Sequence, residues 1–200
     1  MDQLLIALDV EKDARDVIGA SLQDWKDPND EHRANGAESA DYYLKLPVPY
    51  RARNGPLQDT AELLQIRGVT PEIYRGKPDH PGLGEHVTVF GRGVVNVNTA
   101  SRPVLRSLGL SEAEAVDIIQ ARVVTPYAFV PGRFAGRGLG VGSQTFRIEA
   151  EGFVAGEPRA RVVAVVQRRP RQASSALLPG GLAAVTQGVS VQSWRLVEAR

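Results

Sequence analysis

Apolar residues near the start of the chain recur with helical spacing. They are Leu4, Leu5, Leu8, Val17, Ile18, Leu22 and Trp25. Charged residues lie between them, and this pattern is typical of an amphipathic helix. We therefore predict one helix that runs to about residue 23 and presents an apolar face to a packing surface. A polar turn follows, because Pro28 and Gly36 interrupt any regular element there.

The segment 54–75 carries two further helix start signals. Asp59 or Thr60 can cap a helix whose apolar face follows directly, because their side-chain oxygens accept hydrogen bonds from free backbone amides. Thr70 precedes Pro71, which is favoured in the first turn of a helix. We predict two short helices in this segment.

A pair of short helices is predicted after a short strand at 94–98. Thr99 can cap the first helix, and Gly109 lies where a left-handed residue is favoured at a helix end. Ser111 and Glu114 form a capping-box pattern for the second helix, which runs toward residue 122. Such pairs occur both in helix-hairpin-helix modules and in inserted helical domains.

The last third of the chain has the alternation of apolar and polar residues that is typical of half-buried strands. This pattern predicts strands at 144–154, 161–168 and 189–197, and an earlier one at 86–90. The segment 170–188 is rich in Ala, Ser and Gly and is predicted to be loop or disordered. The fold class is therefore α+β, with an opening helix packed on an antiparallel sheet and a helical block between them.

Composition excludes several classes of protein. The 200 residues are 42% hydrophobic and 24% charged, which fits one globular domain or two small ones. No cysteine is present, so a disulfide framework and a thiolate metal site are excluded. No apolar run approaches the roughly 18 residues that a membrane-spanning helix needs.

Negative charge is concentrated at the start of the chain, where residues 1–41 hold eleven Asp or Glu against four Lys or Arg. The oxygen-bearing side chains of the turn are Asp24, Asp27, Asn29, Asp30, Glu38 and Asp41. Calcium takes six to eight oxygen ligands from flexible turns of this kind. The spacing is not that of an EF-hand. A calcium site and a solvated acidic turn both remain open from the residues alone.

Nothing in the sequence indicates catalysis or nucleotide binding. The glycine-rich run 136–142 precedes a predicted strand, whereas a dinucleotide-binding loop follows a strand and opens a helix. The three histidines are far apart and have no partner at metal-ligand spacing. No nucleophile signature is present. We therefore predict a protein that is not an enzyme.

The helix pair leaves a nucleic-acid-binding alternative. DNA-binding helix-hairpin-helix modules use a Gly, apolar, Gly turn, but the turn here is Gly109-Leu110-Ser111. The second helix begins with Glu112 and Glu114, whose charge would repel phosphates. Salt-sensitive DNA binding that charge reversal at Arg106 and Arg122 abolishes would favour this alternative.

A set of motifs across residues 20–130 resembles one family. The motifs, in chain order, are Asp24-Trp25 with Asp27, Gly36-Ala37-Glu38 with Tyr42 or Tyr43, Pro49-Tyr50, Asn54-Gly55-Pro56, Glu62-Leu63, Gly68-Val69-Thr70 with Tyr74, and Asn96-Val97-Asn98-Thr99-Ala100-Ser101 with Leu105, Leu108 and Ala115. Together they resemble the K-type minor pseudopilins of the bacterial type II secretion system, also called general secretion pathway protein K. The terminal strands are similar to this family only in character.

The resemblance implies a pilin-like body, in which an N-terminal helix packs on an antiparallel sheet, interrupted by a large inserted α-helical domain with helix-hairpin-helix-like pairs. On this basis we expect residues 1–45 and 132–200 to form the pilin-like body and residues 46–131 to form the inserted domain.

The resemblance also implies a function. Family members are subunits at the tip of a periplasmic pseudopilus, joined to I-type and J-type minor pseudopilins and to inner-membrane secretion machinery, and they support protein export across the outer membrane. A leader and an apolar anchoring helix begin the family's chains, so we expect this chain to be the periplasmic part, with membrane contact only through an N-terminal helix that this sequence lacks.

The resemblance implies two sets of site residues. Calcium occurs in the family, which makes Asp24, Asp27, Asp30 and Glu38 the candidate ligands. We expect the side chains of Leu4, Leu5 and Leu8 to be only partly covered and to bind partner pseudopilin helices. No nucleic-acid partner is expected. The alternative is a cytosolic helix-hairpin-helix nucleic-acid-binding module.

Overall fold

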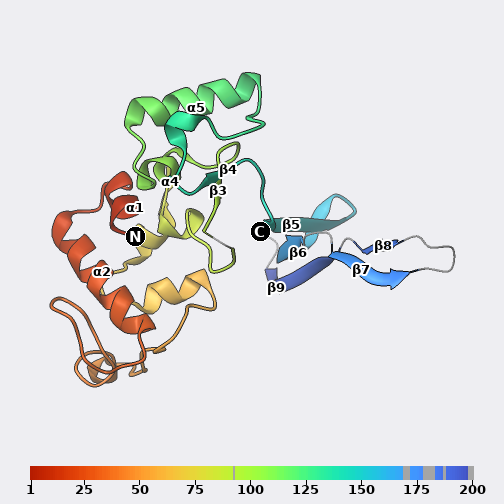
Figure 1. Cartoon of the computed structure of the whole chain (residues 1–200). Helices are drawn as coiled ribbons and strands as arrows, with labels where there is room; N and C mark the ends of the chain where they lie inside the picture. The colour runs from red at the N-terminus through yellow and green to blue at the C-terminus, as the bar shows by residue number, and fades with distance from the viewer. Residues whose placement is uncertain (92, 169–171, 178–182, 187, 198–200) are drawn as a thin grey trace. The chain divides into compact units, whose positions relative to one another are not determined.

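The computed structural model describes residues 1–200 except 92, 169–171, 178–182, 187 and 198–200. The chain forms two compact units (Figure 1). The first unit comprises Met1–Val89 and Gly93–Val141 and contains the helices. The second contains the long C-terminal strands. No helix among the described residues is long and apolar enough to span a membrane.

The predicted first helix is divided into α1 (Asp2–Ala7) and α2 (Lys12–Lys26), so the prediction of one continuous helix is wrong. The chain turns at Asp9, which has a left-handed φ of 56°. The amide of Val10 donates to the carbonyl of Leu5 at 3.0 Å. Arg15 of α2 donates from Nη1 to the carbonyl of Val10 at 2.8 Å. These bonds satisfy the backbone groups that the break leaves free.

The apolar face of α1 is used inside the unit. Leu5 is fully buried, Leu4 is 7% exposed, and Leu8 is half-buried against the same core. The expectation that these side chains are only partly covered is therefore wrong for Leu4 and Leu5. The physical reason is that α1 packs against α2 and α4 (Arg102–Ser107), which bury its apolar residues.

The helix pair that was predicted after the strand at 94–98 is present as α4 and α5 (Glu112–Val124). Ser101 rather than Thr99 occupies the N-cap position of α4, because the amides of Thr99 and Ala100 bond back to the carbonyl of Asn96 in a turn. The predicted capping box of α5 is confirmed. Ser111 Oγ accepts from the amide of Glu114 at 3.2 Å, and Glu114 Oε2 accepts from the amide of Ser111 at 2.7 Å.

We expect Ser111→Ala to lower the free energy of unfolding by about 1 kcal/mol, because it removes one half of this capping box. Ser107→Ala is the matched control, since Ser107 Oγ donates only to the carbonyl of Val104 within α4 and caps no helix. Urea denaturation of both variants measures the difference. Equal losses of stability would show that the cap contributes nothing specific.

The two helix pairs repeat one local geometry at an offset of 100 residues. Leu5 and Leu105 are both fully buried, as are Ile18 and Ile118. The turn of the first pair has Asp9 at φ 56°, and that of the second has Gly109 at φ 81°. A left-handed residue thus ends the first helix of each pair. That the inserted domain contains helix-hairpin-helix-like pairs stays a prediction.

Short elements connect the helix pairs. They are η1 (Tyr43–Lys45), η2 (Thr60–Gln65), α3 (Pro71–Arg75), β1 (Gly76–Lys77) antiparallel to β2 (His80–Pro81), η3 (Leu83–Glu85), β3 (Val95–Asn96) parallel to β4 (Leu139–Gly140), and η4 (Gly132–Phe134). The predicted caps Asp59 and Thr70 are confirmed. The predicted strand at 86–90 is wrong, because the chain there follows a 3-10 turn and pairs with no described strand.

The second unit contains a three-stranded antiparallel sheet in the order β5-β6-β9. Its strands are β5 (Thr145–Val154), β6 (Glu157–Arg168) and β9 (Val189–Val197), so the three predicted strands are confirmed. β7 (Gln172–Leu177) pairs with β8 (Ala183–Thr186), which corrects the prediction of loop or disorder for these residues. The rest of 169–187 lies outside the described residues.

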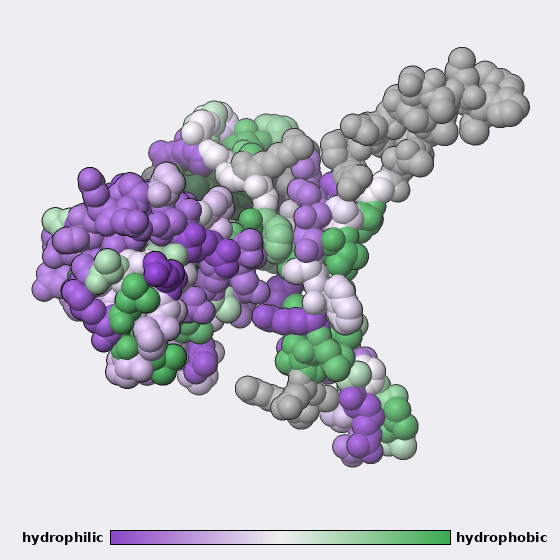
Figure 2. Space-filling view, turned by 90° about the horizontal axis from the view of Figure 1, so that it is seen from below, coloured by the Kyte–Doolittle hydropathy of each residue, from purple (hydrophilic) through white to green (hydrophobic). Residues whose placement is uncertain are grey.

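One face of this sheet is apolar and exposed. Ile148 pairs with Ala164, and Ala164 pairs with Trp194, so all three share a face. Trp194 is 69% exposed. Figure 2 shows hydrophobic residues gathered on this unit, whereas the visible face of the helical unit is mostly hydrophilic. The opposite face is charged, with Glu149 between Arg147 and Arg161.

The compact units differ from the predicted domain boundaries. Residues 1–45 belong to the same unit as residues 46–131, because α1 packs on α4. That unit ends at Val141 rather than at residue 131, because β4 pairs with β3. A pilin-like body that unites residues 1–45 with the terminal strands stays a prediction.

Candidate functional site

The acidic turn after α2 folds back onto the end of that helix. The side chain of Asp24, in the last turn of α2, is fully buried. Gly36 lies against it so closely that a Cβ at this position would be 1.9 Å from Asp24 Oδ2. Asn35 supports the approach with a left-handed φ of 65°. The residue types at 35 and 36 therefore allow the loop to cover a buried carboxylate.

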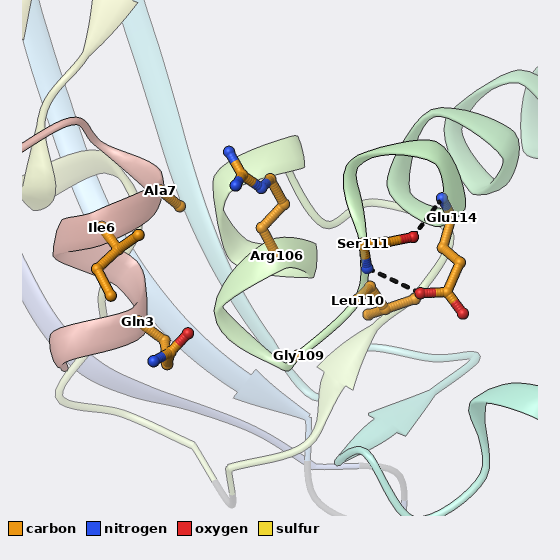
Figure 3. Close-up of a pocket in the computed structure, with 8 residues that line it drawn as sticks. All are labelled: Gln3, Ile6, Ala7, Arg106, Gly109, Leu110, Ser111 and Glu114. Atoms are coloured by element: carbon orange, nitrogen blue, oxygen red, sulfur yellow. Dashed lines mark hydrogen bonds between the residues drawn. The ribbon is translucent and has the colours of Figure 1, made fainter.

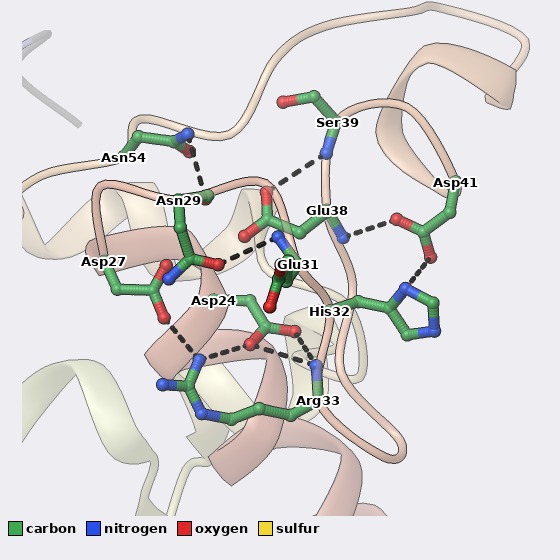
Figure 4. A network of polar contacts seen from close by, with 10 residues as sticks. All are labelled: Asp24, Asp27, Asn29, Glu31, His32, Arg33, Glu38, Ser39, Asp41 and Asn54. Carbon is green, nitrogen blue, oxygen red and sulfur yellow. Dashed lines mark hydrogen bonds and ion pairs between the residues drawn. The ribbon is translucent and has the colours of Figure 1, made fainter.

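Arg33 provides the positive charge inside this turn (Figure 4). Its Nη1 lies 2.6 Å from Asp24 Oδ1 and also pairs with Asp27 Oδ2. Its backbone amide donates to the Asp24 carboxylate, 3.1 Å from Oδ2. One guanidinium thus bridges two carboxylates, and both raise the pKa of Arg33.

Glu38 is the least satisfied group of the turn. It is 1% exposed, and its Oε1 has no hydrogen-bond partner among the described residues. Its Oε2 accepts a long hydrogen bond of 3.3 Å from the amide of Ser39. Burial raises the pKa of Glu38, and the negative charges of Asp24, Asp27 and Asp30 raise it further. The carboxylate therefore lies in a negative, desolvated environment that favours a cation.

Residues from later in the chain close the turn. Asn54 donates from Nδ2 to Asp30 Oδ1 at 3.0 Å, and its own Oδ1 is buried without a hydrogen-bond partner among the described residues. Asp41 accepts from the amide of Glu38 at 2.9 Å. Arg67 donates from Nη1 to the carbonyl of Gly36 at 2.9 Å. Segments 24–41, 54 and 67 are thus joined by polar contacts.

An aromatic cluster lies in the core of this unit, next to the acidic turn. Trp25 and Tyr43 meet edge to face with ring centroids 5.2 Å apart, and Tyr43 lies 5.3 Å from Tyr50. Burial raises the pKa of Tyr43 to about 12. Its hydroxyl accepts from the amide of Arg67. These aromatic residues belong to three of the motifs that carry the family resemblance, so the cluster brings together motifs that are separate in the sequence.

The four predicted calcium ligands lie close enough for the charges of the three Asp residues to act on Glu38. In the part of the chain that the structure describes, no three His, Asp or Glu side chains are arranged to hold a metal ion as they stand. Arg33 lies between two of the carboxylates instead. The alternative of a solvated turn is wrong for Asp24 and Glu38, which are buried.

The donor set fits a hard cation by its chemistry. Two buried oxygens lack hydrogen-bond partners among the described residues, Glu38 Oε1 and Asp27 Oδ1, and Asn54 Oδ1 is a third. Calcium is bound by carboxylate and amide oxygens of this kind. Sequence reasoning missed Arg33 and Asn54. Asn54 had a signal as part of the Asn54-Gly55-Pro56 motif, although it was not assigned to the site, and Arg33 had none.

Because the pKa of Glu38 is raised, the stability of the protein should depend on pH. The folded state favours the protonated form, so the cost of ionising Glu38 is present at neutral pH and absent below the ordinary value of 4.5. In chelator at pH 7 we expect Glu38→Gln to raise the melting temperature by roughly 2–4 °C. At pH 4 we expect no gain.

The control for this prediction is Glu31→Gln, which removes a charge from an exposed residue of the same turn. Its effect should be smaller than that of Glu38→Gln at pH 7. A gain from Glu38→Gln that persists unchanged at pH 4 would contradict the electrostatic explanation.

A separate hollow of about 330 Å³ lies between α1 and the turn from α4 to α5 (Figure 3). Gln3 and Ile6 line it from α1, Arg106 from α4, and Glu114 from α5. Glu114 is already used in the capping box. The opposite charges of Arg106 and Glu114 give the hollow no preference for one class of ion.

Comparison with known proteins finds a family model similar to the first part of the chain. Residues 1–76 match the family model described as type II secretion system (T2SS), protein K. This segment contains the whole acidic turn together with Asn54 and Arg67. The first 76 residues of the chain are thus similar to protein K of this secretion system.

Curated relatives of protein K agree with this match. Type II secretion system protein K of Pectobacterium carotovorum subsp. carotovorum is 40% identical over 72 residues, which are 36% of this chain and 22% of that protein. Type II secretion system protein K of Klebsiella pneumoniae is 33% identical over 120 residues, which are 56% of this chain and 35% of that protein. The matched part of the chain thus spans about a third or less of these relatives.

A chain of a solved secretion-system complex has a similar fold. The crystal structure of the GspK-GspI-GspJ complex from the type 2 secretion system of enterotoxigenic Escherichia coli matches 99% of this chain and 70% of the matched chain, with a TM-score of 0.64 and 23% identity. This likeness agrees with the mixed helix and antiparallel-sheet fold predicted from the sequence.

Proposed function

We propose that this chain is the periplasmic part of a minor pseudopilin that assembles with I-type and J-type pseudopilins at the tip of a type II secretion pseudopilus. The observation that carries the proposal is the match of residues 1–76 to protein K. The likeness in fold to a chain of a GspK-GspI-GspJ complex supports these partners. The role is structural: the protein supports export of other proteins across the outer membrane and catalyses no reaction.

The exposed apolar face of the β5-β6-β9 sheet supports a pilin-like body. Sheets with one apolar face are stable when a helix or a second sheet covers that face. We propose that an amphipathic helix covers it in the assembled protein and links the body to the inner membrane. The charged face around Glu149 would then remain in the periplasm.

Calcium binding at the acidic turn is a second part of the proposal. Asp24, Asp27, Asp30 and Glu38 would hold the ion, and its charge would offset the mutual repulsion of these carboxylates. The partnerless buried oxygen of Glu38 supports this assignment. An extracytoplasmic site can rely on calcium near the millimolar range, so weak and flexible coordination suffices.

The nucleic-acid alternative has little support from the helix pairs. Its two candidate arginines are used within the first unit. Arg106 pairs with Glu112 at 3.4 Å, and Arg122 donates to the carbonyls of Val97 and Ala100, both at 2.8 Å. Arg122 is thus held by backbone carbonyls, and Glu112 partly offsets the charge of Arg106.

Size-exclusion chromatography with light scattering tests the proposed assembly. We expect the chain to co-elute with the soluble I-type and J-type domains of the same bacterium as one species heavier than any single component. Persistent separate elution at micromolar concentration would contradict the proposal. A DNA duplex in place of the partners should leave the elution unchanged. A salt-sensitive shift that Arg106→Glu and Arg122→Glu abolish would favour the alternative.

A further inference from the structure

The guanidinium of Arg33 lies between carboxylates of the acidic turn, where a metal cation would also be attracted. Arg33 is the residue that bridges the carboxylates of Asp24 and Asp27. Both carboxylates are candidate calcium ligands, and a carboxylate oxygen that pairs with a guanidinium is not free to coordinate an ion. The guanidinium and calcium therefore compete for the same oxygens.

The environment of Arg33 favours its release. Its side chain is 43% exposed, whereas that of Asp24 is fully buried. The guanidinium can therefore move into solvent while the carboxylate stays in place behind Gly36. The backbone amide of Arg33 also bonds to Asp24, so the turn can keep one contact after the side chain leaves. The other nearby arginine, Arg67, bonds the carbonyl of Gly36 instead and is not a competitor.

We infer that Arg33 is a built-in counter-ion that holds the acidic turn in its metal-free form and is displaced when calcium binds. This inference rests on the proposed calcium site. It predicts that removal of the Arg33 side chain lowers the stability of the metal-free protein and raises its affinity for calcium. By linkage, the factor by which Arg33 weakens calcium binding equals the factor by which calcium weakens the contribution of Arg33.

The test uses Arg33→Gln in the whole chain, with Arg102→Gln as the matched control. Arg102 is also a partly exposed arginine that pairs with one carboxylate, Glu112, but it lies outside the turn. Melting curves are recorded in chelator and in saturating calcium, and calcium affinity is measured by isothermal titration calorimetry.

We expect Arg33→Gln to melt below the wild-type protein in chelator and to match it in saturating calcium. If the calcium-competent form is about a tenth of the metal-free population, removal of Arg33 tightens calcium binding about tenfold. Arg102→Gln should change neither the affinity nor the response to calcium. Arg33→Lys keeps the charge but cannot bridge two carboxylates with a planar group, so it should also melt lower in chelator and bind calcium more tightly.

The outcomes separate the two proposals. If the wild-type protein binds calcium and Arg33→Gln binds it equally or less tightly, the inference about Arg33 is wrong and the calcium site stands. If neither protein binds calcium, the calcium site itself is wrong. An Arg33→Gln variant that is unfolded in chelator but folds in calcium supports the inference, and one that is unfolded in both overturns it.

Discussion

Replacement of Gly36 by Ala should lower the free energy of unfolding by about 2–4 kcal/mol, because a well-packed turn is overfilled and a buried carboxylate loses its bonds. The added Cβ would lie 1.9 Å from Asp24 Oδ2 and 2.9 Å from Asp24 Cγ, so the carboxylate has to move. Its movement also breaks the pair with Arg33. Urea denaturation in chelator measures the loss.

Gly19→Ala is the control, because Gly19 lies inside α2 and a Cβ there meets no atom within 4 Å. An alanine in the middle of a helix is favoured over glycine, so this variant should gain about 0.5–1 kcal/mol. The two substitutions are chemically identical and should have opposite signs. A Gly36→Ala protein as stable as the wild type would show that the turn opens without cost.

Chelation of calcium should lower the melting temperature of the wild-type protein. At free calcium about 100 times the dissociation constant, binding to the folded state adds about 2.7 kcal/mol, which corresponds to roughly 5–10 °C in a chain of this size. Magnesium should restore the melting temperature less well, because it demands a stricter octahedral geometry. Melting curves in chelator, calcium and magnesium measure this directly.

The variant with Asp24→Ala and Asp27→Ala should lose the difference between chelator and calcium. The control is Asp16→Ala, which removes a partly exposed carboxylate of α2 that pairs only with Lys12 at 2.5 Å. That variant should keep the full response to calcium. Identical melting curves of the wild-type protein in chelator and in millimolar calcium would reduce the turn to a structural ion-pair network.

Local signals in the sequence predicted local features of the fold well. The capping box of Ser111 and Glu114 and the cap at Thr70 involve residues within four positions of one another, so the chain itself specifies them. The strands of the β5-β6-β9 sheet were likewise predicted from alternation. The caps depend on the local chain alone, whereas the strands also need the partners with which they pair.

Features that depend on distant partners were missed. The break at Asp9 is specified by Arg15 and by the packing of α1 on α4, which helical periodicity does not reveal. The segment 86–90 has a strand-like composition but no strand beside it among the described residues. Tertiary context overrode local preference in both cases.

The candidate site shows the same division. Its acidic residues were visible as a dense run of carboxylates, and their grouping around Glu38 follows from that density. The role of Arg33 was not visible, because an arginine in an acidic segment is usually a solvated surface residue. Only the folded turn shows that its guanidinium lies between Asp24 and Asp27.

The most direct test of the acidic turn as a calcium site is anomalous diffraction at long wavelength from crystals grown in saturating calcium. We expect an anomalous peak among the carboxylates of Asp24, Asp27 and Glu38, with the Arg33 side chain turned away from both Asp residues. A map with no peak at this position, and with Arg33 still paired to Asp24 and Asp27, would contradict the account.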